Sequence, residues 1–230
     1  MCGRFAMDQR VENLIQEFVA DGGDFRDWRP SWNIRPTDTI PIVIETGTAG
    51  AKAVRRIEPA RWSLVPPWST ELRLRFATFN ARSETVAEKA SFRDAVRSQR
   101  ALIPARGYYE WHGEGSAKTP YFVTGKAPMV FAGLYSWWFD PVRSAGDRGG
   151  RLLTTTILTM ESVPALAAIH DRNPVMLPRD WWDGWLDPGV AGDQAFVDAA
   201  VEASGPVAGS MRFHQVRPVR GDGPSLIKPI

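Results

Sequence analysis

The chain has 230 residues, 43% of them hydrophobic and 23% charged, which is ordinary for a globular protein. Its formal net charge is only +2, too small to indicate nucleic-acid binding from bulk charge, and one cysteine excludes an internal disulfide. No secretory signal and no apolar run near the ~18 residues of a membrane span are visible, so we expect a cytoplasmic protein without a membrane partner.

The first half of the chain predicts one helix followed by strands. Asp8 can cap a helix that runs to about Ala20. After loop-like residues 21–39, strands are expected over 40–45 and 53–57. A further strand lies within 61–68 and ends at Pro66-Pro67-Trp68, a stiff turn that presents an aromatic side chain. Residues 83–97 are expected to be largely helical.

The second half is rich in short strands. These are expected over 101–104, 107–111, 121–124, 129–135, 152–159, 175–177 and 212–219. Helices are expected over 161–169, from Pro178 through the tryptophan cluster at 181–185, and over 194–203. This interleaving predicts an α+β fold: a single domain over 1–230 with a curved, barrel-like, mostly antiparallel β core flanked by short α-helices. We expect a monomer.

The only cysteine lies at position 2, directly after Met1. Removal of Met1 would give Cys2 an α-amine and a thiol on adjacent carbons, and such a 1,2-aminothiol condenses with aldehydes to a thiazolidine ring. The amine titrates near ~7.7–8.0, so part of it is neutral and nucleophilic at cellular pH. The alternative is an inert cysteine at a frayed terminus. The neighbours Gly3, Arg4 and Phe5 favour the reactive interpretation, because a cation beside a thiol lowers its pKa and can hold phosphate.

Two polar segments lie in apolar surroundings. In the first, Asn80 offers an amide and Arg82 can pair with a phosphate at the start of a helix, which is itself an anion site. Helix capping alone also explains this segment. In the second, Glu110 interrupts an aromatic strand, where desolvation would raise its pKa toward the range useful for proton transfer. A solvent-facing Glu110 on an alternating strand is equally compatible with the pattern.

A third segment joins His170 and Arg172 between an apolar helix and an apolar strand. The pair could serve as proton donor and phosphate clamp, although a single histidine is more often structural. Three scattered histidines and one cysteine give no zinc-ligand spacing, and no Walker loop, GxGxxG or GxSxG motif occurs, so neither a metal nor another cofactor is expected.

Together these segments resemble the SOS response-associated peptidase (SRAP) family of abasic-site processing proteins. The resemblance covers nearly the whole chain in order and rests on Met1–Phe5, Trp32–Pro36, Arg61–Trp68, Asn80–Thr85, Ser91–Arg93, Arg100–Trp111, Lys118–Tyr121, Phe131–Tyr135, His170–Arg172 and Gly223–Ile227. One residue departs from the family pattern: Asn173 stands where methionine usually follows His-x-Arg.

The resemblance implies a covalent mechanism on single-stranded DNA that contains an abasic site. Cys2 would capture the ring-opened aldehyde as a thiazolidine crosslink, and Glu110 would move protons. His170 would protonate the sugar O4′, and Asn80 would orient Cys2 and the lesion. The DNA contacts implied are Arg4, Arg82 and Arg172 on phosphates, Asn33 and Thr159 at the lesion, and Trp68 and Trp111 near the bases.

The same resemblance implies autocatalytic removal of Met1, lyase-like activity on abasic sites and a place in the SOS response. It also implies a nucleoid-associated location and contact with replication or repair machinery. An N-terminal-nucleophile thiol peptidase or amidohydrolase is the first alternative, but it gives no reason for phosphate-binding arginines. A single-strand-binding module with an incidental Cys2 and a purely structural interaction protein are the remaining alternatives.

Overall fold

The computed structural model describes residues 2–9, 11, 28–47, 53–115, 118–140 and 150–230. The helix expected from Asp8 to Ala20 lies mostly outside the described residues. The strands are β1 (Arg4–Met7), β2 (Ser31–Ile34), β3 (Thr39–Thr46), β4 (Val54–Trp62), β5 (Asn80–Arg82), β6 (Arg100–His112), β7 (Thr119–Phe139), β8 (Arg151–Glu161), β9 (Arg172–Pro174) and β10 (Arg212–Gln215). The helices are η2 (Ser83–Thr85), α2 (Arg93–Ser98), η5 (Arg179–Trp181), α3 (Trp182–Leu186), α4 (Gln194–Gly209) and η6 (Pro224–Ile227).

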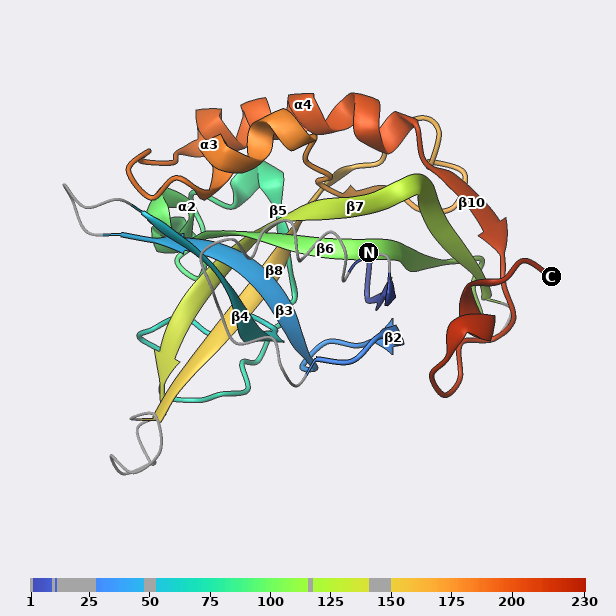
Figure 1. Cartoon of the computed structure of the whole chain (residues 1–230), viewed down its shortest axis with the longest axis horizontal. Coiled ribbons are helices and arrows are strands. Elements are labelled where there is room, and N and C mark those ends of the chain that lie inside the picture. Colours follow the sequence, from blue (N-terminus) through green and yellow to red (C-terminus); the bar gives the residue numbers. More distant parts are fainter. Residues whose placement is uncertain (1, 10, 12–27, 48–52, 116–117, 141–149) are drawn as a thin grey trace.

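The ten described strands form one sheet that closes on itself. Eight strands follow the order β10-β7-β8-β4-β3-β6-β1-β2, and β5 and β9 both pair with β8. A further pairing of β6 with β7 completes a ring of β7, β8, β4, β3 and β6. All pairings are antiparallel except those that β8 makes with β4 and β5. Figure 1 shows the curved sheet with α3 and α4 along one side. The predicted curved, barrel-like, mostly antiparallel α+β fold is therefore confirmed.

An aromatic cluster fills the core beside the first strand. The ring of Phe5 meets those of Trp62 and Phe131 edge to face, at centroid distances of 4.9 and 6.0 Å. Edge-to-face pairs of this kind contribute about 0.5–1.5 kcal/mol beyond their buried area. Since Phe5 is fully buried, the start of the described chain is fixed to the core rather than frayed.

Two strands are longer than the sequence indicates. The expected pieces 101–104 and 107–111 are one strand, β6, with an irregularity between Ala105 and Gly107, and 121–124 and 129–135 are parts of β7. At Gly107 the chain passes so close to β7 that an added Cβ would lie 2.4 Å from the carbonyl oxygen of Val123. Only glycine fits there, and it lets β6 bend without ending.

Two local predictions are wrong. Residues 164–169 form turns instead of the helix expected over 161–169, and the strand expected over 175–177 lies three residues earlier, as β9. The backbone of Val175 bonds to two different strands, donating to Leu158 of β8 and accepting from Ala132 of β7. Because its hydrogen bonds go to two strands, the apolar segment 175–177 is held in the core without forming a regular strand of its own.

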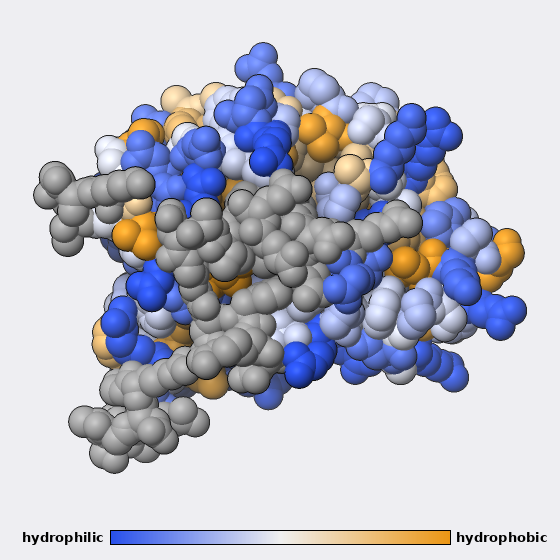
Figure 2. Space-filling view, viewed as in Figure 1, coloured by the Kyte–Doolittle hydropathy of each residue, from blue (hydrophilic) through white to orange (hydrophobic). Residues whose placement is uncertain are grey.

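Other expected elements are found with changed bounds. Residues 83–97 hold two short helical pieces, η2 and α2, joined by turns, and the last strand stops at Gln215. The described helices include none long and apolar enough to span a membrane. The coloured part of the face shown in Figure 2 is mainly hydrophilic, with small separate hydrophobic areas.

Candidate active site

Cys2 is held beneath the surface by the strand that follows it. Pairing of β1 with β6 sets Arg4 opposite Tyr109 and Phe5 opposite Tyr108, and Cys2 is fully buried. The Nδ2 atom of Asn80, from β5, donates a 2.8 Å hydrogen bond to the Cys2 carbonyl oxygen. The thiol itself contacts the carbonyl oxygen of Arg4 at 3.7 Å. Thus β6 and Asn80 together fix the backbone that carries the thiol.

The pKa of the Cys2 thiol is raised well above its ordinary value. Burial is the main cause, because it disfavours the thiolate, and the nearby negative charge of Glu110 adds to the shift. The cysteine therefore keeps its proton at neutral pH in the state with Met1 attached. A nucleophilic sulfur in this site requires a group that removes that proton as the sulfur reacts.

Glu110 is a buried carboxyl group on the strand beside Cys2. It is 2% exposed, and burial raises its pKa to about 7. Because side chains alternate along a strand, Glu110 shares one face of β6 with Tyr108. The Cys2 and Glu110 charges also contribute to the raised pKa of Tyr108, after its burial. The buried alternative of the sequence analysis is correct, and Glu110 can both donate and accept a proton near neutral pH.

His170 faces Glu110 from the connection between β8 and β9. The Nε2 atom of His170 lies 4.0 Å from the Oε2 atom of Glu110. On the other side of the ring, Nδ1 accepts a 3.0 Å hydrogen bond from the backbone N–H of Arg172 and lies 2.7 Å from Oδ1 of Asp171. These two contacts favour opposite states of Nδ1, because the Arg172 N–H needs an acceptor and the Asp171 carboxylate needs a donor, and partial burial lowers the His170 pKa.

The side chain of Asn173 holds the connection between β8 and β9 in place through two hydrogen bonds. Its Oδ1 atom accepts a 2.9 Å hydrogen bond from the N–H of Val163, and its Nδ2 atom donates to the carbonyl oxygen of Pro174. The backbone N–H of Ser162 donates to Asp171, closing the same loop. The residue that departs from the family pattern is fully buried and ties together the turns that present His170.

Arg172 forms a bidentate pair with a residue that the sequence analysis did not select. Its two terminal nitrogens lie 2.6 and 2.9 Å from the carboxylate oxygens of Glu84, and one of them donates to the carbonyl oxygen of Thr159 at 2.7 Å. Burial alone would raise the Glu84 pKa, but these hydrogen bonds bring the net value below the ordinary one. Both terminal nitrogens of the Arg172 guanidinium, which was predicted to hold phosphate, therefore already form hydrogen bonds within the protein.

A second group of predicted residues meets near the C-terminal segment. The Arg4 guanidinium lies 5.6 Å from the centre of the Trp111 ring and donates to Oδ1 of Asn33 at 3.1 Å. It also donates to the carbonyl oxygen of Val219. Asn33 in turn donates to the carbonyl oxygen of Gly221. Arg4 thus connects the first strand to the last segment of the chain.

Trp68 and Arg82 lie apart from these contacts. Trp68 is 57% exposed on the turn after Pro67, and the exposed Arg82 guanidinium makes no hydrogen bond or ion pair with a described residue. None of the described contacts joins either of them to Cys2, Glu110 or His170. Both side chains are open to solvent and available to a ligand.

The described residues contain no cluster of three or more His, Cys, Asp or Glu side chains suited to a metal ion. The four residues predicted to be catalytic form two contacts: Cys2 with Asn80, and Glu110 with His170. The two contacts are electrostatically coupled, because the charge of Glu110 raises the pKa of the Cys2 thiol. This set of a thiol, an amide, a carboxyl group and an imidazole suits proton-assisted covalent chemistry at a carbonyl carbon.

The chain matches the family described as SOS response associated peptidase (SRAP) over residues 1–219. It belongs to the SRAP family. It is 35% identical over 192 residues to the abasic site processing protein YoaM of Bacillus subtilis, covering 82% of this chain and 80% of YoaM. It is also 28% identical over 241 residues to the abasic site processing protein YedK of Escherichia coli, with both chains covered fully.

The SRAP fold is also found in solved structures. A crystal structure of a Bacteroides thetaiotaomicron protein superposes with a TM-score of 0.79 at 21% identity, covering all of both chains. A second crystal structure, of a Bordetella bronchiseptica protein, gives 0.72 at 22% identity and covers 94% of this chain and 100% of that protein. These likenesses support the fold alone.

Proposed function

We propose that this protein processes abasic sites in single-stranded DNA by forming a thiazolidine crosslink through Cys2. The observation that carries the proposal is the placement of a buried thiol beside a carboxyl group whose pKa is raised to about 7. The abasic site processing proteins named above, at 28–35% identity, support the same substrate. Met1 must first be removed by hydrolysis of the Met1–Cys2 peptide bond, since only then is the Cys2 amine free.

The reaction begins with opening of the abasic sugar. The imidazolium form of His170 donates a proton to O4′ as the bond from O4′ to C1′ breaks, and the C1′ hydroxyl loses its proton to water, leaving an aldehyde and a neutral imidazole. The Cys2 amine adds to C1′, and loss of one water gives an imine. The Cys2 sulfur then adds to the same carbon, and its proton passes to the nitrogen, closing the five-membered ring.

Glu110 is suited to the proton transfers in this sequence. With a pKa of about 7, it can take a proton from the attacking amine and return one to the departing water. It can also take the proton of the Cys2 thiol, whose raised pKa otherwise keeps the sulfur neutral. Asn80 fixes the Cys2 carbonyl, and its buried Oδ1 atom has no partner among the described residues, so it can accept from the free amine or the lesion.

DNA is proposed to bind across the exposed Arg82 and Trp68 and the partly buried Arg4 and Trp111. Arg82 contacts a phosphate, and Trp68 stacks on a base, a mode of binding that does not depend on sequence. Arg4 and Trp111 form one edge of the binding surface, with Asn33 behind them. Arg172 follows His170 by two residues and donates to the carbonyl oxygen of the fully buried Thr159, and its guanidinium is shared between Glu84 and DNA.

Intact-protein mass spectrometry tests the proposal with single-stranded DNA that carries one abasic site. Met1-free protein should gain the mass of the strand less one water, without a reducing agent. Cys2→Ala keeps an α-amine but lacks the thiol, so its adduct should appear only after borohydride reduction of the imine. An otherwise identical strand without the lesion should give no adduct.

The same experiment separates the proposal from its main alternative. If Met1-free protein gives no reduction-independent adduct, crosslinking through Cys2 is wrong. Transfer of an acyl group to Cys2 from an amide or peptide substrate would then support the N-terminal-nucleophile thiol peptidase or amidohydrolase. The spectrum of protein alone also reports whether Met1 has been removed.

A further inference from the structure

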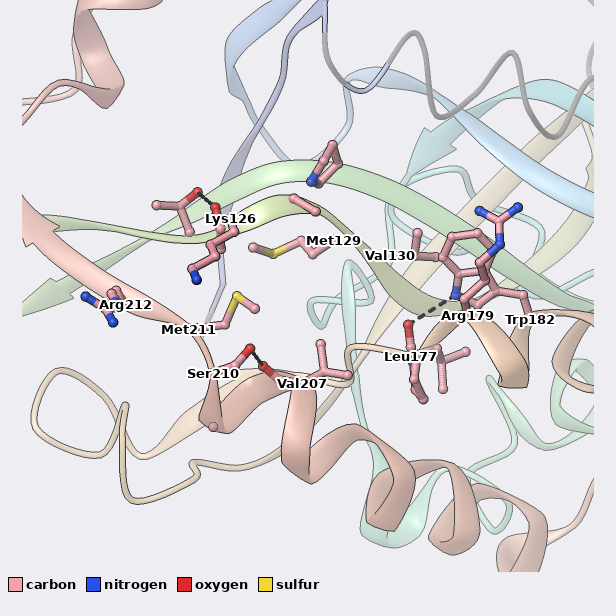
Figure 3. A pocket seen from close by; sticks show the side chains of 16 residues that line it. Lys126, Met129, Val130, Leu177, Arg179, Trp182, Val207, Ser210, Met211 and Arg212 are labelled. Atoms are coloured by element: carbon pink, nitrogen blue, oxygen red, sulfur yellow. Dashed lines mark hydrogen bonds between the residues drawn. The ribbon is translucent and has the colours of Figure 1, made fainter.

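A groove of about 1160 Å³ lies between the bend of β7, the start of α3 and the end of α4. None of the residues assigned to DNA or catalysis lines it. Figure 3 shows Met129 from β7 and Met211 from the α4–β10 junction pointing toward one another inside it. Met211 packs so tightly over β7 that a Cβ added at Gly125 would lie 2.9 Å from its Cε atom.

The floor of the groove is apolar and closely packed. Met129, Val130 and Leu177 are each at most 3% exposed, and Val207 and Trp182 form the half-buried walls. The indole of Trp182 is fixed by a 3.1 Å hydrogen bond from its Nε1 atom to the carbonyl oxygen of Leu177. Methionine side chains adapt to differently shaped apolar partners, so this floor can accept a side chain such as leucine or phenylalanine.

The rim of the groove is cationic. Lys126, Arg179 and Arg212 line it, and no Asp or Glu occurs among its described lining residues. Neither Lys126 nor Arg212 forms an ion pair with a described residue, and both are exposed. The Arg179 guanidinium lies 5.1 Å from the centre of the Trp182 ring. Because the whole chain carries a net charge of only +2, this local excess is a property of the groove.

We propose that this groove docks a short acidic peptide segment with apolar anchor residues, carried by a partner protein. Carboxylates of the peptide would meet Lys126 and Arg212, and its apolar side chains would contact Met129 and Met211. A nucleic acid is the less suitable occupant, since the floor offers apolar side chains where a phosphate chain needs donors. The site is independent of the chemistry at Cys2.

Fluorescence anisotropy tests the proposal with two labelled peptides on the full chain. One has four aspartates followed by leucine, glycine and phenylalanine, and the other has the reverse order, so both chain directions are covered. At least one should saturate with a Kd below about 1 mM. Replacing its aspartates by asparagine, or its two apolar residues by serine, should each weaken binding at least tenfold.

Two groove variants and a matched control locate the binding. The double variant Lys126→Glu/Arg212→Glu should weaken binding at least tenfold, and Met211→Gln should weaken it without changing charge. The control Lys89→Glu/Arg93→Glu makes the same charge change at exposed positions outside the groove and should change the Kd less than twofold. Circular dichroism establishes that each variant is folded.

Three results would overturn the proposal. They are no saturable binding by either peptide, an equal loss in the groove and control variants, and an unchanged Kd in both groove variants. Lesion-free single-stranded DNA is titrated in parallel. If reversing Lys126 and Arg212 weakens DNA binding while the peptides do not bind, the groove belongs to the nucleic acid. None of these results depends on crosslinking, so failure here leaves the proposed function untouched.

Discussion

The Nε2 atom of His170 lies 4.0 Å from the Oε2 atom of Glu110, so an imidazole and a carboxyl group whose pKa values are shifted in opposite directions face one another. Burial raises the Glu110 pKa to about 7, and partial burial lowers the His170 pKa. Burial thus disfavours both charged forms, the carboxylate and the imidazolium, and favours a protonated Glu110 beside a neutral His170. Such a pair suits a reaction that needs an acid at one step and a base at the next.

Glu110→Gln should slow crosslink formation by at least about 10²-fold, the usual contribution of a positioned acid or base. The wild-type rate should rise with pH and inflect near 7, because the carboxylate form of Glu110 accepts protons from the amine and thiol. The variant should keep only the inflection of the α-amine near ~7.7–8.0. Single-turnover rates measured from pH 5 to about 9 check this. Glu114→Gln, an exposed position beyond the end of β6, is the control and should behave as wild type.

The same carboxyl group should destabilise the fold at high pH. Its folded pKa is raised, so between about pH 4.3 and 7 the folded state binds more protons than the unfolded state and stability falls as pH rises. Glu110→Gln should therefore be more stable than wild type above pH 7, by about 1–3 kcal/mol, and equal to it near pH 4. Urea unfolding at both pH values measures this, and an equal difference at both would contradict the assigned pKa.

Glu84→Gln should lower the free energy of unfolding by about 1 kcal/mol, because it breaks a bidentate pair whose carboxylate is partly exposed. The Glu84 pKa is depressed in the folded state, so this contribution is present above the unfolded pKa and lost as pH falls through the folded pKa. Thermal unfolding at neutral and acidic pH should show the difference only at neutral pH. Glu88→Gln, an exposed position close by, should change neither melting curve.

Arg82→Ala should weaken binding to single-stranded DNA equally for all sequences. If Arg82 neutralises one phosphate, the slope of log K against log salt should become less steep by roughly 0.7. Arg93→Ala removes another exposed arginine and is the matched control. An unchanged slope for Arg82→Ala would mean that its guanidinium does not contact phosphate.

The sequence marked candidate site residues by their chemistry, whatever elements carry them. It left Glu110 open between a buried and a solvent-facing position, because an alternating strand allows both, and the structure buries it. It also marked His170, which the structure places 4.0 Å from Glu110 although the helix expected before it consists of turns. Those turns are closed by the side chain of Asn173, and hydrogen bonds from a side chain to the backbone cannot be read from apolar periodicity.

Contacts between distant segments were beyond the reach of the sequence. Arg172 pairs with Glu84, 88 positions earlier, and only the fold brings η2 to the end of β8. The strand positions near Val175 were missed for a related reason. Apolar side chains predicted the burial of this segment, but the split bonding of its backbone to β7 and β8 depends on where those strands end.

The position of β1 has a mechanical consequence. This strand is paired on both sides, with β2 and with β6, and Phe5 is locked in the aromatic core. DNA joined to Cys2 would be attached next to a strand that is hydrogen-bonded along both of its edges. A motor pulling on the DNA would load the β1–β6 hydrogen bonds together, along with the core contacts of Phe5. Release of the DNA by force would then require β1 to be pulled out of the sheet, whereas reversal at Cys2 would leave the sheet intact.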